Sequence, residues 1–171
     1  MMERATGIST RSDLLSLVKR QMTPEAIGAA ATELGEDRER TASAVSAMVP
    51  SVLEAFSDVA RTDRGAAHLT EAIESEATVE EPSTAARLVS GGARFDQNLL
   101  DDELGGDAWA LSDNAARSAG IGRESAHKLL GGVASMALFA LARSGRALSP
   151  GALRSVLGSA PAGHVPPKLA V

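Results

Sequence analysis

The sequence predicts an all-α protein, a compact multihelical domain with two similar helix-Gly-helix units. Hydrophobic residues make up 44% of the 171 residues while Phe, Trp and Tyr make up only 2%, so the apolar residues are helix formers such as Ala and Leu rather than aromatic strand formers. Apolar residues also recur at helical spacing between residues that cap helices. A third observation is that one such stretch matches another 85 residues further along the chain.

The first helical unit is predicted to span residues 12–77, after an N-terminal arm of residues 1–11. A short amphipathic helix begins it. Thr23 followed by Pro24 is an N-cap with proline at the first helical position, which predicts the start of a second helix. Gly35 is expected to end that helix, because glycine adopts the left-handed C-cap conformation without steric cost.

A longer third helix is expected from Asp37 to about residue 61. Pro50 lies inside it and is expected to kink it, because proline lacks a backbone N–H and its ring crowds the preceding turn. A fourth, shorter helix is expected over residues 65–77. Apolar side chains share one face of the third helix: Val45, Met48, Val49, Val52, Leu53 and Phe56.

The helical pattern fails over residues 78–106. This stretch is rich in glycine and acidic residues, and brief helical patterns occur in it only at 84–89 and 96–104. We expect a linker or a partly helical lobe here.

The second helical unit is predicted to span residues 107–158. Asp107 caps a helix that Gly120 ends, and a long apolar helix follows. Ser149 and Pro150 repeat the cap-plus-proline signal before a last short helix. A proline-containing C-terminal tail, residues 159–171, is expected to be extended.

An internal repeat relates the two units. Residues 30–56 align without a gap with residues 115–141, and seven of the 27 positions are identical. The shared pattern is a helix, a glycine stop, Arg-Glu at the next helix start, and a long apolar helix. We interpret it as a duplication, although alanine-rich helices also match by chance.

The second unit carries the signs of a known family. They are Ala-Gly-Ile-Gly at 119–122, the apolar helix at 129–141, the closing segment 153–157, Leu-Gly-Gly at 104–106 and the earlier helix centred on Pro50. In these features the chain resembles the YidB-like family of bacterial proteins of unknown function, over most of residues 12–158. The resemblance implies a compact cytoplasmic domain with a homeodomain-like helix arrangement, and it implies no catalytic residues. The chain departs from the family in a less glycine-rich middle and a proline-bearing tail.

Residues 115–130 also fit a helix-turn-helix. This motif needs a small residue in the first helix, glycine at the turn and apolar residues that lock the second helix. Those positions are filled by Ala116, Gly120, Ile121, Ala126 and Leu129. The outer face of the second helix would then carry Arg123, Glu124, His127 and Lys128. The same residues also fit an αα-corner with a glycine cap, and we favour that packing interpretation.

Charge is distributed unevenly along the chain. Residues 1–113 hold 10 basic and 21 acidic side chains, whereas residues 114–171 hold 7 basic and 1 acidic side chain. This basic segment is expected to face the acidic part of the same chain or of another copy, and a nucleic acid is the less favoured partner. The candidate residues for contact with a nucleic acid or an acidic partner are Arg117, Arg123, His127, Lys128, Arg143 and Arg146.

Gly131 and Gly132 interrupt the long apolar helix. Glycine in a helix interior costs about 1 kcal/mol relative to alanine, so its presence indicates that another backbone packs closely there. We expect that neighbour to belong to the partner helix of the repeat or to a second subunit. Gly131, Gly132, Met136 and Phe139 are therefore candidates for helix–helix association.

The composition argues against several kinds of chemistry. The chain has no cysteine, and His68, His127 and His164 show no paired metal spacing. The acidic residues between Asp96 and Asp107 lack the ligand spacing of an EF-hand loop. Glycine-rich phosphate loops and nucleophile elbows are missing too. We therefore expect no metal, no cofactor and no enzymatic activity.

The longest uncharged run, residues 129–142, has 14 residues, fewer than the roughly 20 needed to span a bilayer. We interpret it as a buried core helix and expect a cytoplasmic protein that does not contact a membrane. The apolar tip of the tail, Leu169, Ala170 and Val171, is a candidate docking peptide, and a frayed terminus is the alternative.

Together these features predict a non-catalytic helical interaction or self-assembly module that binds a protein partner or itself as a homo-oligomer. The alternative is a nucleic-acid-binding protein that uses residues 115–130.

Overall fold

The computed structural model describes residues 11–78, 80, 86–89, 108–143 and 149–158. These residues form helices joined by turns and contain no strand, so the all-α prediction is confirmed for them. Residues 1–10 of the predicted arm, most of the predicted linker and the C-terminal tail lie outside the described residues.

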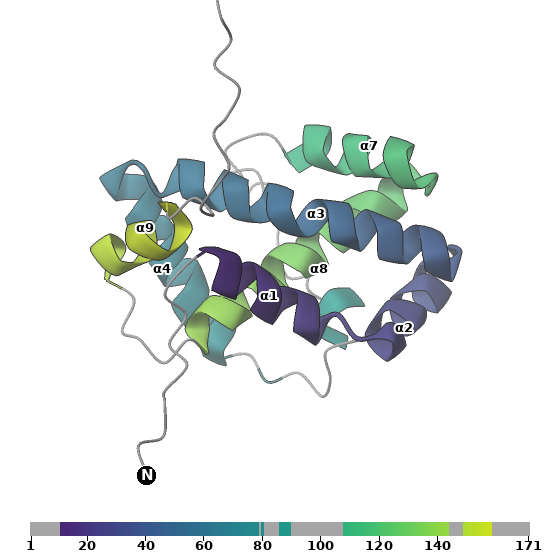
Figure 1. Cartoon of the computed structure of the whole chain (residues 1–171), viewed down its shortest axis with the longest axis horizontal. Coiled ribbons are helices and arrows are strands. Elements are labelled where there is room, and N and C mark those ends of the chain that lie inside the picture. Colours follow the sequence, from purple (N-terminus) through teal and green to yellow (C-terminus); the bar gives the residue numbers. More distant parts are fainter. Residues whose placement is uncertain (1–10, 79, 81–85, 90–107, 144–148, 159–171) are drawn as a thin grey trace, which may run out of the picture.

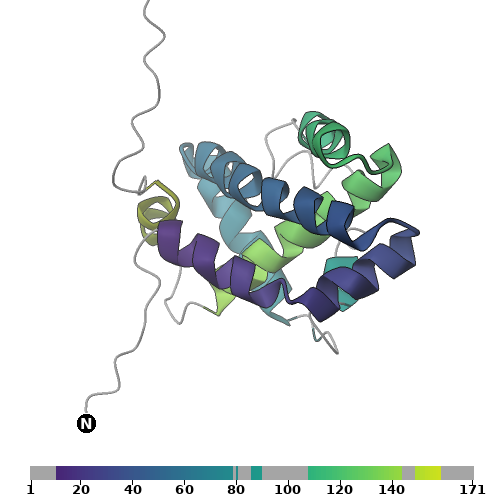
Figure 2. The same ribbon diagram turned by 45° about the vertical axis from the view of Figure 1, so that its right-hand side comes forward.

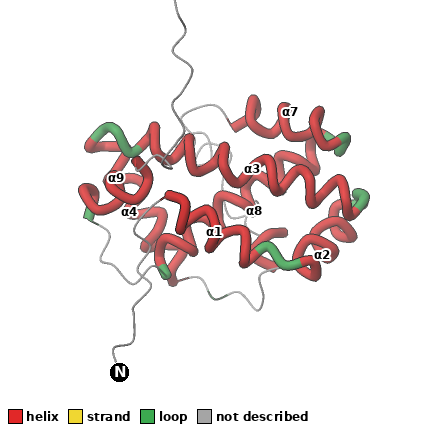
Figure 3. Tube along the Cα trace, in the orientation of Figure 1, coloured by secondary structure: helices red, strands yellow, loops and turns green. Residues whose placement is uncertain are grey.

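Four helices precede the linker, joined by short turns (Figure 3). They are α1 (Arg11–Gln21), α2 (Pro24–Leu34), α3 (Arg38–Val59) and α4 (Asp63–Thr78). Each corresponds to a helix expected from the sequence, and α4 begins two residues earlier than predicted.

The predicted N-cap of α2 is confirmed, and Asp37 caps α3 in the same way. The hydroxyl oxygen of Thr23 accepts a hydrogen bond from the Ala26 N–H at 3.2 Å, and Pro24 occupies the first helical position. The Asp37 carboxylate accepts one from the Arg40 N–H at 3.1 Å. Such bonds satisfy backbone donors that have no partner within the helix.

Pro50 lies inside α3, which continues as one helix from Arg38 to Val59, and the kink expected at Pro50 stays a prediction. Pro50 is exposed, so its ring lies away from the core. The predicted apolar face is buried as expected: Val45, Met48, Val49, Val52, Leu53 and Phe56.

The second half contains α7 (Ala108–Ala119), α8 (Arg123–Ala142) and α9 (Pro150–Gly158). Residues 86–89 form a helical turn within the predicted stretch 84–89. Asp107 and the predicted helical stretch 96–104 lie outside the described residues.

The helix α8 is the centre of the fold. It contacts α1, α3, α4 and α7 and crosses the molecule behind α1 and α3 (Figures 1 and 2). Of residues 129–142, all but Phe139 and Ala142 are buried, so the predicted core helix is confirmed. By length and composition alone α8 could also span a membrane, but 72% of its most apolar window is buried inside the fold, as in a core helix.

Both helix-Gly-helix units turn in the same way. Gly35 ends α2 with φ 68° and Gly120 ends α7 with φ 73°, the left-handed conformation that favours glycine. The residue after each glycine donates its N–H to an equivalent carbonyl, Glu36 to Ala31 at 2.9 Å and Ile121 to Ala116 at 3.2 Å. The two units therefore share a local geometry, and their origin by duplication stays a prediction.

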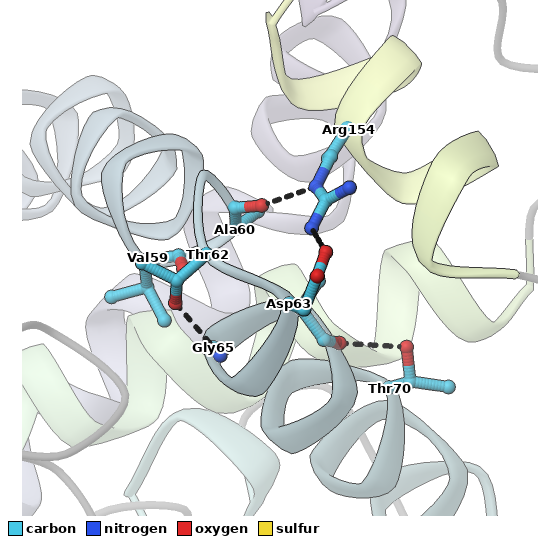
Figure 4. A network of polar contacts seen from close by, with 8 residues as sticks. Val59, Ala60, Thr62, Asp63, Gly65, Thr70 and Arg154 are labelled. Atoms are coloured by element: carbon cyan, nitrogen blue, oxygen red, sulfur yellow. Dashed lines mark hydrogen bonds and ion pairs between the residues drawn. The ribbon is translucent and has the colours of Figure 1, made fainter.

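The helix α9 is fastened to the turn between α3 and α4 by Arg154 (Figure 4). Its Nε donates to the Ala60 carbonyl oxygen at 2.7 Å, and its Nη2 lies 2.5 Å from Asp63 Oδ1. One side chain thus joins α9 to the end of α3 and the start of α4.

Gly65 allows this α3–α4 turn to be tight. Its N–H donates to the Thr62 hydroxyl oxygen at 3.0 Å, which caps α4. A Cβ at position 65 would lie 1.9 Å from the Val59 carbonyl oxygen, so a larger residue would force the two helices apart.

Candidate interaction surface

The turn between α7 and α8 positions the predicted contact residues. Gly120 reverses the chain, and Ile121 is buried beneath the turn. Ala116, Ala126 and Leu129 are also buried, so the residues that fit the helix-turn-helix pattern pack the two helices together. Such packing is common to helix-turn-helix motifs and to αα-corners.

Side chains from the two helices meet in pairs on one face. Trp109 and Asp113 lie one turn apart on α7, and Arg123 and His127 lie one turn apart on α8. The Trp109 and His127 rings stack, with centroids 3.9 Å apart and planes 7° from parallel. Arg123 Nε lies 2.7 Å from Asp113 Oδ1. The Arg123 guanidinium also lies 4.9 Å from the Trp109 ring centroid.

Arg117 extends this face toward the turn. Its Nη2 donates to Asn114 Oδ1 at 3.0 Å, and it borders a shallow hollow together with Gly120, Ile121 and Arg123. We refer to Trp109, Asp113, Arg117, Arg123 and His127 as the Trp109 surface.

The structure brings together three of the six predicted basic contact residues: Arg117, Arg123 and His127. Lys128 is exposed on the next position of α8. Arg143 follows the far end of this helix, about 30 Å from Arg123 at 1.5 Å per residue. Arg146 lies outside the described residues.

The α2–α3 turn packs against the α7–α8 turn. Glu36 Oε1 accepts a hydrogen bond from the Gly122 N–H at 2.9 Å, and Arg40 Nη1 donates to the Gly120 carbonyl oxygen at 3.2 Å. A carboxylate therefore occupies the N-terminus of α8, where a DNA-reading helix presents its base-contacting residues. The negative charge of Glu36 disfavours a phosphate at that end.

Two basic residues of the C-terminal segment pair with acidic residues of the preceding segment, as expected from the charge distribution. They are Arg123, which pairs with Asp113, and Arg154, which pairs with Asp63. Both pairs are partly exposed, so each contributes little to stability.

A second group of polar residues is buried between α4 and α8. Glu76 is 5% exposed and Arg87 is 4% exposed, and the guanidinium donates to Glu76 Oε1. The same carboxylate oxygen accepts a hydrogen bond from the Ser135 hydroxyl at 2.5 Å. The Arg87 guanidinium also lies 3.9 Å from the Phe139 ring centroid.

Sequence reasoning missed Glu76 and Arg87. The signal available for Glu76 is its spacing, because position 76 continues the apolar face formed by Leu69 and Ile73, seven and three residues earlier. Arg87 lies in a stretch whose pattern predicts no core position.

The predicted association residues lie inside the chain. Gly131, Gly132 and Met136 are buried, and Phe139 is half-buried against Arg87. A Cβ at position 132 would lie 1.8 Å from the Leu88 carbonyl oxygen. The close backbone that Gly132 indicates is therefore the turn of residues 86–89, and neither the repeat's partner helix nor a second subunit.

The remaining candidate sites are these. His68 lies on α4 and His127 lies on α8. His164, the acidic cluster 96–107 and the docking tip Leu169, Ala170 and Val171 lie outside the described residues. Within the described part of the chain no group of three His, Cys, Asp or Glu side chains could hold a metal ion.

A family model described as "Bacterial protein of unknown function (DUF937)" matches residues 16–144. No curated protein and no solved structure matches the chain.

Proposed function

The chain belongs to this family of bacterial proteins of unknown function, as its YidB-like resemblance predicted, and we propose that it is a non-catalytic helical interaction module that self-associates through the Trp109 surface. The observation that carries the proposal is the position of Trp109. It is the single tryptophan of the chain, and it is half-buried at the surface between His127 and Arg123 rather than in the core.

The residue types of this surface support binding to a protein. Tryptophan and arginine are enriched among the residues that contribute most to protein–protein affinity. Arg117 and Arg123 are already held by Asn114 and Asp113, so binding would immobilise fewer side chains and lose less entropy.

The mixture of charges favours a second copy as the partner. Acidic Asp113 and Glu124 lie close in sequence to basic Arg117, Arg123 and Lys128 on the same two helices. Two copies related by a two-fold axis present the same patch to each other, so a patch with both signs can pair opposite charges. We also propose that the protein is cytoplasmic, uses no cofactor and contacts no membrane.

Nucleic-acid binding by residues 115–130 has less support. Arg123 is paired with Asp113 and Glu36 occupies the N-terminus of α8, so few positive charges at that end are free of a neighbouring carboxylate. A salt-dependent shift of labelled DNA by the wild type, lost in Lys128→Ala, would favour this alternative over self-association.

Analytical ultracentrifugation over a concentration series, at about 0.1 M and 1 M salt, tests the proposal. We expect a dimer, and we expect Trp109→Ala to weaken dimerisation at least about 10-fold, or about 1.4 kcal/mol. Arg61→Ala is the matched control, because Arg61 is an exposed arginine paired with Asp58 outside this surface. A wild type that stays monomeric at every concentration and salt would refute self-association.

A further inference from the structure

The turn of residues 86–89 is held by what we call the Arg87 site, formed by Glu76 of α4 and by Gly132, Ser135 and Phe139 of α8. Arg87 and Leu88 are both buried. The Arg87 guanidinium bonds the Glu76 carboxylate and stacks on Phe139, and Leu88 places its carbonyl against Gly132. This segment is thus bound by charge, by an aromatic face and by a close backbone approach.

The Arg87 site is specific for an arginine that is followed by a residue whose backbone packs against Gly132. A guanidinium is planar, so it can stack on Phe139 while it donates to Glu76. A lysine would lose the stacking geometry, and a neutral residue would leave a buried carboxylate without its cationic partner. Gly132 is needed as well, because any side chain there would overlap Leu88.

The occupant of the site is a separate short segment. A single helical turn is not stable alone, so residues 86–89 depend on the contacts from α4 and α8. Seven residues separate them from α4 and 18 separate them from α7. A short element that is joined by long connections and held by a specific site is suited to exchange between identical chains.

We propose that the Arg87 site is a receptor for an arginine–leucine segment, and that it also accepts Arg87 and Leu88 of a second copy in a reciprocal exchange. The seven residues 79–85 span at most about 25 Å when extended, so the exchange is limited to two molecules in direct contact. This inference goes beyond the Trp109 surface, because it uses different residues.

Mixing two variants of the full chain tests the exchange. Arg87→Ala keeps the site and lacks the arginine, whereas Glu76→Ala keeps the arginine and lacks the carboxylate, so neither variant has a matched pair alone. Because the chain has no cysteine, Ala47→Cys on the exposed side of α3 supplies one labelling position for each dye. We expect energy transfer in the mixture and a heterodimer at least about 10-fold tighter than either self-association.

The double variant Glu76→Ala, Arg87→Ala is the control, and with Trp109→Ala added to every chain it should give no energy transfer with Glu76→Ala. Trp109→Ala added to both partners should leave the exchange unchanged, which separates this inference from the Trp109 surface. Folded variants, verified by circular dichroism, that remain separate monomers on mixing would overturn the proposal.

A peptide probe covers the case in which these variants do not fold. The labelled peptide Ser-Thr-Ala-Ala-Arg-Leu-Val-Ser-Gly copies residues 83–91 and is added to the milder variant Arg87→Lys and to the wild type. We expect tighter binding to the variant, because the tethered wild-type segment, at an effective concentration of about 1 mM, competes for the site more strongly than the tethered lysine segment does. A peptide with alanine in place of arginine should not bind, and equal affinities for variant and wild type would contradict the proposal.

Discussion

The substitution Gly132→Ala tests how the turn of residues 86–89 is held. A Cβ at this position would lie 1.8 Å from the Leu88 carbonyl oxygen and 2.7 Å from its carbonyl carbon, distances at which the backbone must move. If the turn leaves, exposing Leu88 costs about 2 kcal/mol and separating Arg87 from Glu76 costs about 3 kcal/mol. Alanine returns about 1 kcal/mol through its helix propensity. A complete release therefore destabilises the fold by about 4 kcal/mol.

A partial shift of the turn would cost less. Forcing extra atoms into a packed core costs about 1–3 kcal/mol, again offset by the helix propensity of alanine. The net cost of a partial shift is therefore about 0–2 kcal/mol, so the expected loss of unfolding free energy ranges from about 0 to about 4 kcal/mol. The sign matters more than the size, because Gly→Ala in a helix interior ordinarily stabilises a protein.

The matched control is Gly28→Ala in α2. A Cβ there would lie 3.5 Å from the Arg38 side chain, an ordinary contact, so only the propensity term applies. We expect this variant to be more stable than the wild type by about 0.5–1 kcal/mol.

Urea unfolding followed by circular dichroism measures both free energies. Thermal melts should show opposite shifts, at about 3 °C per kcal/mol for a chain of this size. A Gly132→Ala variant as stable as Gly28→Ala would refute the close approach of Leu88 and the reasoning built on it.

Three further predictions concern the caps and turns. Gly65→Ala should destabilise the chain by about 1–3 kcal/mol in urea unfolding, because its Cβ would meet the Val59 carbonyl oxygen; an unchanged midpoint would contradict this. Arg154→Ala should cost about 1–2 kcal/mol with little salt dependence, since a backbone carbonyl bond is lost as well as the exposed Asp63 pair. Thr23→Ala should cost about 1 kcal/mol, and Thr23→Ser should restore the melting temperature.

Local features of this fold could be predicted from the sequence because their causes are local. Thr23, Pro24 and Gly35 determine the ends of α2 through bonds that span only three to five residues. The uncharged run 129–142 predicted the central helix because so many adjacent apolar residues, too few to span a bilayer, suit the interior of a fold.

The surface and its partners were harder to predict. The sequence indicated Arg117, Arg123 and His127, but not that Trp109 lies between two of them, because this requires the packing of α7 on α8. The bond from Gly122 to Glu36 joins residues 86 positions apart, and no local pattern specifies it. That bond is also what weighs against nucleic acid at this helix end.

Glu76 shows what kind of signal could have identified the Arg87 site. It continues the buried face of Leu69 and Ile73, and a carboxylate on such a face needs a cationic partner within the core. In the following stretch the described residues that are buried are Leu88 and Arg87, and arginine counts as polar in every hydrophobic pattern, so no apolar periodicity marks them. A charged residue on an apolar helix face therefore predicts an oppositely charged partner, and that partner can lie in a segment that has no hydrophobic periodicity. In this chain Arg87 is the partner of Glu76. Gly132 correctly indicated that another backbone packs closely, but it did not indicate which one. The segment that packs there, residues 86–89, is held by the ion pair of Arg87 with Glu76, and hydrophobic periodicity does not reveal such a pair.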